Sequence, residues 1–142
     1  MSIVIHTDGG SRGNPGKAAI GVVVFEGGEV VYELSSYIGI ATNNEAEYQA
    51  LIAALEWLRA NQEKLGERAA GPVVFKLDSK LVVEQVNKRW KIKEARLRNL
   101  AEKCWALLAT ITIPTKITHV LRSRNADADA LANQALDAQA GP

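Results

Sequence analysis

The chain has 142 residues, 47% of them hydrophobic, which is enough for one globular domain over residues 1–142 with a substantial core. A formal net charge of +1 excludes binding to nucleic acid through bulk charge alone, and the single cysteine, Cys104, excludes an internal disulfide and a cysteine-based zinc site. Because no apolar run approaches a membrane span and no signal peptide opens the chain, we expect a cytoplasmic protein that does not enter membranes.

The first expected element is a short strand, Ile3–Thr7, which leads into Asp8 and a glycine-rich loop over Gly9–Gly16. An acid at the end of a buried strand would face a cleft, and glycines beside it would let the backbone approach a bound phosphate or sugar. The alternative is an ordinary hairpin turn, since Asp and Gly are common turn residues. The glycine spacing fits neither a P-loop nor a dinucleotide-binding fingerprint.

Two further strands, 19–26 and 29–40, are joined by Gly27-Gly28, which is a hairpin signal. Apolar residues spaced by three and four predict a helix that opens at 41–44 and runs to about Ala60. The remaining expected elements are a loop over 61–72, a strand over 73–77, a helix over 80–87, an irregular basic stretch over 88–93, a helix over 95–109, a strand over 116–121, a loop over 122–125 and a helix over 127–138. We expect the last few residues to be flexible.

This order of elements predicts an α/β fold. Three antiparallel strands followed by strand–helix units indicate a five-stranded mixed sheet, with three antiparallel strands plus two parallel ones, flanked by helices on both faces. Right-handed crossovers would place the fourth strand beside the first.

Four acids lie at the expected element boundaries. Asp8 and Asp78 end the first and fourth strands, whereas Glu47 and Asp129 lie in the first turns of the first and last helices. If the two strands are neighbours, all four carboxylates can face one cleft. Each acid alone also has a structural explanation, because acids favour and cap helix starts. The candidate caps are the Thr42–Glu45 capping box, Asp78-Ser79 and Asp127.

Converging carboxylates repel one another and are partly protonated unless cations bind them. Oxygen ligands without His or Cys select Mg²⁺, with Mn²⁺ as the alternative. Two such ions about 3.5–4 Å apart can activate water and stabilise the leaving oxygen in phosphodiester hydrolysis.

Four motifs in order resemble those of the type 1 ribonuclease H family, and the resemblance covers nearly the whole chain. They are Thr7-Asp8-Gly9-Gly10-Ser11-Arg12-Gly13-Asn14-Pro15-Gly16, Thr42-Asn43-Asn44-Glu45-Ala46-Glu47-Tyr48, Leu77-Asp78-Ser79 and Ala128-Asp129-Ala130-Leu131-Ala132. The resemblance implies an RNase H-like fold and an endonuclease that cuts the RNA strand of an RNA–DNA hybrid with two Mg²⁺ ions. It implies 5′-phosphate and 3′-hydroxyl products.

The resemblance also implies roles for individual residues. It assigns catalysis and metal binding to Asp8, Glu47, Asp78 and Asp129. One ion would lie near Asp8 and Asp129 and activate water, and the other near Asp8, Glu47 and Asp78 at the leaving oxygen. Substrate contacts, which suit the ribose 2′-hydroxyl, are assigned to Gly9, Gly10, Asn14, Thr42, Asn43, Asn44 and Ser79.

Two regions depart from the family pattern. The loop before the last acid lacks the histidine found in many relatives, and Arg124 is our candidate for its catalytic role; His119 lies in an expected strand and is interpreted as structural. The stretch 88–93 is shorter than the basic protrusion of some relatives. It either binds DNA phosphates, or it is a solvated surface with its tryptophan against the core. The candidate contacts in it are Arg89, Trp90 and Lys91.

Two other functions compete with the hybrid-specific ribonuclease. A DNA nuclease or strand-transfer protein can share the fold, although the asparagines and glycines suit a ribose edge better. A non-catalytic nucleic-acid-binding module would lack at least one of the four acids, and all four are present. We therefore expect an RNA–DNA hybrid as partner, double-stranded RNA as a second candidate substrate, and a monomer.

Overall fold

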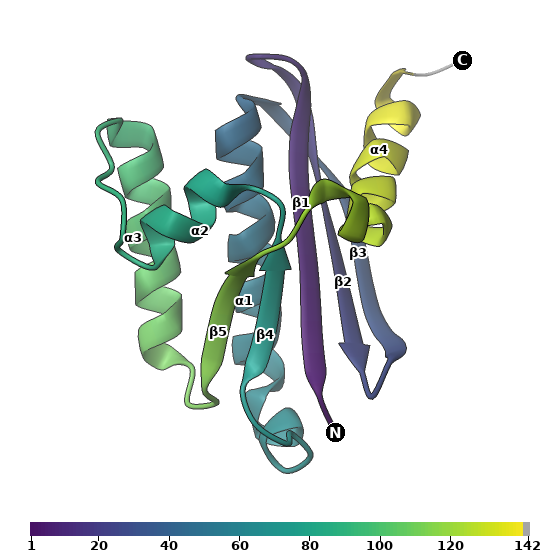
Figure 1. The fold of residues 1–142 in the computed structure, drawn as a ribbon. Coiled ribbons are helices and arrows are strands. Elements are labelled where there is room, and N and C mark those ends of the chain that lie inside the picture. Colours follow the sequence, from purple (N-terminus) through teal and green to yellow (C-terminus); the bar gives the residue numbers. More distant parts are fainter. Residues whose placement is uncertain (141–142) are drawn as a thin grey trace.

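The computed structural model describes residues 1–140 and contains one five-stranded mixed sheet (Figure 1). The strands are β1 (Ile3–Gly13), β2 (Gly16–Glu26), β3 (Glu29–Ala41), β4 (Val73–Leu77) and β5 (Thr115–His119), in the spatial order β3-β2-β1-β4-β5. β1, β2 and β3 are antiparallel neighbours, whereas β1, β4 and β5 run parallel. The predicted fold class is confirmed, including the fourth strand beside the first.

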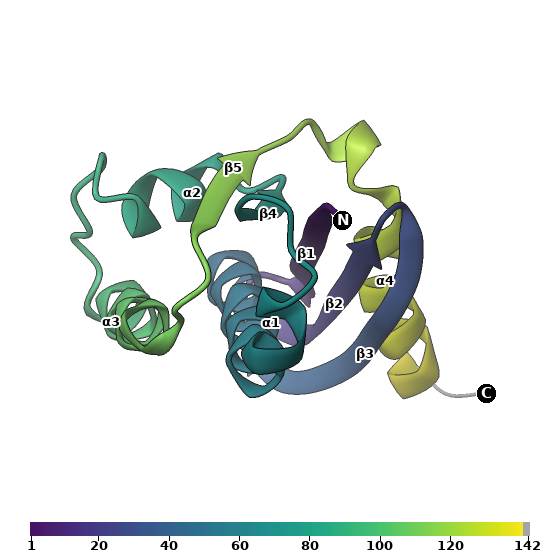
Figure 2. The ribbon, with the colours of Figure 1, turned by 90° about the horizontal axis from the view of Figure 1, so that it is seen from below.

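Helices cover both faces of this sheet, as Figure 2 shows. They are α1 (Asn43–Gly66), α2 (Lys80–Val86), α3 (Ala95–Thr110) and α4 (Ala126–Ala140), with a short 3₁₀ turn, η1 (Arg122–Arg124), before α4. α1 packs on β1 and β2 and is flanked by α3, and α4 packs on the opposite face against β1, β2 and β3. Within residues 1–140, no helix is long and apolar enough to span a membrane.

The main core lies between α1 and the sheet. Leu51, Leu55 and Leu58 repeat at three and four residues along α1 and are fully buried, which confirms the helical pattern read from the sequence. They pack in one cluster with the inward-facing residues of β1 and β4, such as Ile5 and Phe75. The opposite face is joined to α4 by close backbone packing, because a Cβ on Gly21 of β2 would overlap the carbonyl of Ala128.

The glycine-rich stretch after Asp8 is strand and not loop, so this prediction is wrong. β1 continues to Gly13, because its antiparallel pairing with β2 extends to a tight turn at Asn14-Pro15. Asp8 therefore lies inside β1 and not at its end. The parallel pairing of β1 with β4 stops at Thr7, which leaves Asp8 at the edge where β4 ends.

Other boundaries differ by a few residues. α1 continues past Ala60 to Gly66 because Leu65 is buried against the core, and β5 ends at His119, before the exposed Leu121. α4 begins at Ala126, so Asp127 lies in its first turn and is not its cap. The expected C-terminal flexibility falls on residues 141–142, which lie outside the described part of the chain.

Candidate active site

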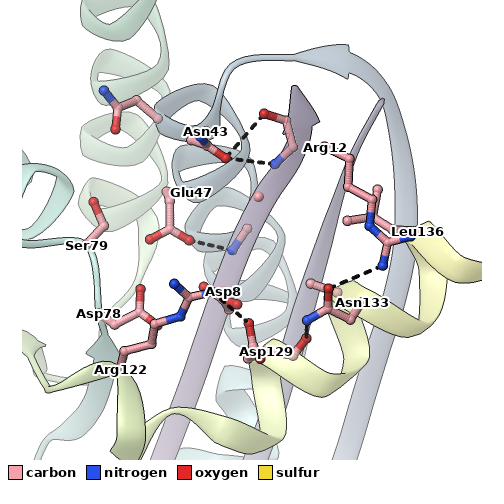
Figure 3. Close-up of a pocket in the computed structure, with 15 residues that line it drawn as sticks. Asp8, Arg12, Asn43, Glu47, Asp78, Ser79, Arg122, Asp129, Asn133 and Leu136 are labelled. Carbon is pink, nitrogen blue, oxygen red and sulfur yellow. Dashed lines mark hydrogen bonds and ion pairs between the residues drawn. The ribbon is translucent and has the colours of Figure 1, made fainter. Parts of the chain in front are cut away.

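A cleft of about 370 Å³ opens at the edge of the sheet where β4 ends (Figure 3). All four acids singled out from the sequence line it. Three of them, Asp8, Glu47 and Asp78, offer carboxylate oxygens that lie within 4.8 Å of one another. Residues distant in the sequence therefore meet in one place, as the strand order predicts.

Each of these three acids is placed by a specific packing contact. Asp8 and Asp78 lie one residue past the paired residues Thr7 and Leu77 of two neighbouring parallel strands. Glu47 faces them because α1 crosses β1 at very short range. A Cβ on Gly9 would overlap the backbone of α1, so only glycine permits this approach.

Glu47 lies one residue beyond the first turn of α1, not within it as predicted. This position buries its carboxyl group, which accepts a hydrogen bond from the backbone N–H of Gly9. The N–H of Gly9 is therefore used within the protein. Gly10, the next residue, has room for a Cβ: the nearest atom would be Oδ1 of Asn43, at 3.8 Å, an ordinary contact distance.

Burial makes this group of carboxylates electrostatically unfavourable without a cation. Burial first, and then the neighbouring charge of Asp78, raises the pKa of Asp8 from 3.8 to about 7. Burial and the charge of Asp8 raise the pKa of Glu47 well above its ordinary value. Closely spaced oxygen ligands with no nitrogen or sulfur fit a hard divalent cation such as Mg²⁺.

Asp129 approaches the cleft from the first turn of α4, as predicted, on the side opposite α1. It lies outside the group of three, and one of its oxygens is 3.8 Å from the guanidinium of Arg122. Arg122 also lines the cleft, whereas Arg124, our candidate from the sequence, is not among the lining residues. Both arginines belong to η1. The 3₁₀ turn there decides which of the two side chains lines the cleft.

The asparagines tie the start of α1 to the end of β1. Oδ1 of Asn14 accepts the backbone N–H of Asn43 at 3.0 Å, and Oδ1 of Asn43 accepts the N–H of Ser11 at 2.8 Å. Asn43 and the exposed Asn44 line the cleft, but Asn14 and Thr42 do not. Within the described residues, the side-chain NH₂ groups of Asn43 and Asn44 make no hydrogen bond, which leaves these donors for a ligand.

Thr42 and Ser79 cap helices, as predicted. Thr42 forms the capping box with Glu45 at the start of α1, and the hydroxyl of Ser79 accepts the N–H of Val82 at 3.3 Å. Ser79 also lines the cleft.

The basic stretch 88–93 lies apart from the acids, between α2 and α3, beside a second hollow of about 390 Å³. The guanidinium of Arg89 makes two hydrogen bonds of 2.8 Å to Glu84. Trp90 is 46% exposed, and Nζ of Lys80 lies 6.0 Å from the centre of its ring, so this side chain is half-buried and not enclosed in the core. Lys91 is exposed and lines the same hollow.

Several lining residues were not found from the sequence. Arg12 reaches the cleft from the end of β1, where it pairs with Asp137 at 2.6 Å, and Asn133 and Leu136 reach it from α4. Their helical spacing from Asp129, at four and seven residues, is the signal that could have found them. Arg12 had no such signal, because it was placed in a loop.

Comparisons with known proteins agree with this geometry. A protein family described as reverse transcriptase-like matches residues 6–135. The chain is 45% identical, over 99% of its length, to the bifunctional protein Rv2228c of Mycobacterium tuberculosis, and spans 37% of that protein. It is 44% identical, over 93% of its length, to the ribonuclease HI of Halobacterium salinarum, and spans 63% of it. The chain thus spans less than two thirds of both relatives.

The structure is also similar to that of LC11-RNase H1, a protein isolated from compost, solved in complex with an RNA/DNA hybrid. The TM-score is 0.90 at 40% sequence identity, and the match covers 99% of this chain and 100% of that one.

Proposed function

Because this chain belongs to the ribonuclease H family, we propose that it is a metal-dependent endoribonuclease that hydrolyses the RNA strand of RNA–DNA hybrids. The observation that carries this proposal is the group of three carboxylates, within 4.8 Å of one another, with a fourth acid on the opposite wall of the same cleft. The relative solved with an RNA/DNA hybrid supports the choice of substrate.

The four acids would hold two Mg²⁺ ions, with Mn²⁺ as the alternative. Asp8, Glu47 and Asp78 form one set of ligands, and Asp8 with Asp129 forms the other. Bound there, the ions would supply activation of water and stabilisation of the leaving 3′ oxygen, giving 5′-phosphate and 3′-hydroxyl products. The protein holds these carboxylates close together before the metal arrives, because packing at Gly9 and the pairing of β1 with β4 fix their backbones.

Recognition of the RNA strand is assigned to the cleft wall formed by the start of α1 and by β1. The NH₂ groups of Asn43 and Asn44 can donate to ribose oxygens, and the backbone at Gly10 is unobstructed by a side chain. Asn14 and Thr42 would act indirectly, because their side chains hold the backbone at the start of α1, which carries Asn43 and Asn44. Since the N–H of Gly9 is occupied by Glu47, we assign it a packing role.

Arg122 takes the place that we had given to Arg124. Its guanidinium lies beside Asp129 and lines the cleft. A permanent cation there can bind the 5′-phosphate of the product as it leaves the cleft. Contacts of Arg89, Trp90 and Lys91 with the DNA strand, a cytoplasmic location, a monomeric state and cleavage of double-stranded RNA stay predictions.

Labelled RNA–DNA hybrid, RNA duplex and DNA duplex, each incubated with and without Mg²⁺, test the proposal. We expect Mg²⁺-dependent cleavage of the RNA strand of the hybrid and none of the DNA duplex. Cleavage of the DNA duplex would instead support a DNA nuclease, and binding of all three without cleavage a non-catalytic module.

Asp78→Asn keeps the shape of the side chain and removes its charge. We expect kcat on the hybrid to fall by at least about 100-fold, since loss of even an outer partner of a metal ligand costs about 10- to 100-fold. Asp127→Asn is the matched control, because Asp127 is exposed, lies in the first turn of α4 and does not line the cleft. Near-normal Mg²⁺-dependent cleavage by Asp78→Asn would refute the metal assignment.

A further inference from the structure

The side chain of Asn125 is completely buried beside the acids, between η1 and α4. Its NH₂ group donates to the carbonyl of Thr7 at 2.8 Å and to Oδ2 of Asp78 at 3.1 Å. Its backbone carbonyl accepts the N–H of Asp129 at 3.1 Å. Thr7 directly precedes Asp8. Asn125 therefore makes hydrogen bonds to Asp78, to Asp129 and to the residue before Asp8, so it is linked to three of the four acids.

The orientation of the Asn125 amide is fixed by its partners. Its Oδ1 lies 2.9 Å from Nδ1 of His6 on β1. An amide oxygen can only accept, so this ring nitrogen carries the proton and donates. Both partners of the NH₂ group are oxygen atoms, so a flipped amide would place its own oxygen against these two oxygens. The His6 ring in turn packs against Phe25 in a T-shaped arrangement, with 5.6 Å between ring centroids.

We propose that Asn125 is a positioning residue that fixes the rotamer of Asp78 and thereby sets the affinity of the site for its divalent cation. The proposal rests on the metal-dependent function argued above. One oxygen of Asp78 is committed to the amide, so the carboxylate can rotate only by breaking a partly buried hydrogen bond. Partners of this kind, one step removed from a metal, orient its ligands, and their loss weakens binding about 10- to 100-fold.

Binding of Mn²⁺ to the substrate-free protein, followed by the electron paramagnetic resonance of free Mn²⁺, tests this role without reference to activity. Asn125→Ala and Asn125→Leu both remove the amide without adding a charge, and leucine keeps about the same side-chain volume. We expect both to bind Mn²⁺ about 10- to 100-fold more weakly than the unaltered protein, with the KM for hybrid unchanged at saturating metal.

Asn87→Ala is the matched control. The amide of Asn87 donates to the carbonyl of Ile117 at 2.9 Å, so its loss also removes a hydrogen bond from the side chain to the backbone, but away from the acids. We expect this variant to lose stability and to keep its affinity for Mn²⁺. Unchanged affinity in a folded Asn125 variant would overturn the positioning role.

A second measurement uses the unaltered protein, so it does not depend on the folding of any variant. In a nuclear magnetic resonance titration with Mg²⁺, the side-chain NH₂ signals of Asn125 should shift, and those of Asn87 should not. If the backbone signals of Asp8 and Glu47 shift while those of the Asn125 amide do not, the positioning role is wrong. If the unaltered protein binds neither ion, the metal-dependent function fails and the positioning role fails with it.

Discussion

Asp8 is a carboxyl group held where ionisation is unfavourable, and this has a consequence for stability. Its pKa in the folded protein is about 7, against 3.8 as the ordinary value. Between these two pH values the folded state keeps a proton that the unfolded chain has lost, so stability falls as the pH rises through this window. A rise of this size in the pKa corresponds to about 4 kcal/mol in the free energy of unfolding. This contribution is fully present below pH 4 and is lost above pH 7.

We therefore expect the metal-free protein to be less stable to urea at pH 8 than at pH 5, by a few kcal/mol. Asp8→Asn should reduce this difference, although the raised pKa of Glu47 will retain part of it. Mg²⁺ should restore stability at pH 8 in the unaltered protein, because it binds the folded state. Equal stability of the metal-free protein at both pH values would contradict the burial of an acid that resists ionisation.

Lys88 is strained in a different way, through its backbone. It follows the C-terminal cap of α2 with φ at +63°, a left-handed conformation that favours glycine. Its ammonium lies 4.8 Å from the centre of the Trp105 ring, which offsets part of the cost.

Comparing two substitutions isolates this strain. Lys88→Ala and Lys88→Gly both remove the ammonium, but only glycine relaxes the backbone. We expect the glycine variant to be about 1 kcal/mol more stable than the alanine variant in urea denaturation. Equal stabilities would mean that the left-handed residue costs nothing in this turn.

At the scale of elements, the crossing of α1 over β1 decides whether Glu47 reaches the other acids. A Cβ at Gly9 would overlap the backbone of α1, whereas at Gly10, on the opposite face of the same strand, it would not. We expect Gly9→Ala to lower the free energy of unfolding by about 1–3 kcal/mol through overpacking, and to weaken Mn²⁺ binding by displacing Glu47. Gly10→Ala, measured by the same urea denaturation and Mn²⁺ titration, should change neither the stability nor the affinity for Mn²⁺ by much. Similar losses in the Gly9→Ala and Gly10→Ala variants would exclude the crossing of α1 over β1 as the cause.

The element types could be predicted from the sequence because each rests on a local pattern. The leucine spacing of α1, the Gly27-Gly28 hairpin and the capping box at Thr42 are all visible within a few residues. The convergence of the acids followed from a rule of topology, which needs only the order of strands.

What was missed depends on contacts distant in the sequence. The glycines after Asp8 are typical of a loop, and only the pairing of β1 with β2 makes them strand. The end of α1 depends on the burial of Leu65 against other elements. Asn125 has no local pattern that distinguishes it from a loop asparagine, because its partners lie on β1 and after β4.

At the scale of the whole molecule, the acidic cleft and the basic stretch 88–93 are joined by α2. This helix has 7 residues and begins directly after Ser79, so the basic stretch starts about 10 Å further along. We predict that a nucleic acid seated in the cleft extends over Trp90 and Lys91. Arg89 should contribute less than Lys91, because Glu84 already neutralises it.

Lys91→Ala tests this extended surface. We expect weaker binding to the hybrid and a salt dependence reduced by about one counterion, as for the loss of one phosphate contact. Lys64→Ala, an exposed lysine near the far end of α1, should leave both unchanged. Binding measured by fluorescence anisotropy over a range of salt concentrations distinguishes them; an unaltered slope in Lys91→Ala would mean that the stretch is only a solvated surface.

The position of α4 couples the fourth acid to the cover of one sheet face. This helix carries Asp129 and packs over β1, β2 and β3. A chain in which α4 has detached from the sheet therefore has three acids in its cleft and one bare sheet face. Detachment of this one helix thus removes Asp129 from the cleft and exposes sheet surface in the same event.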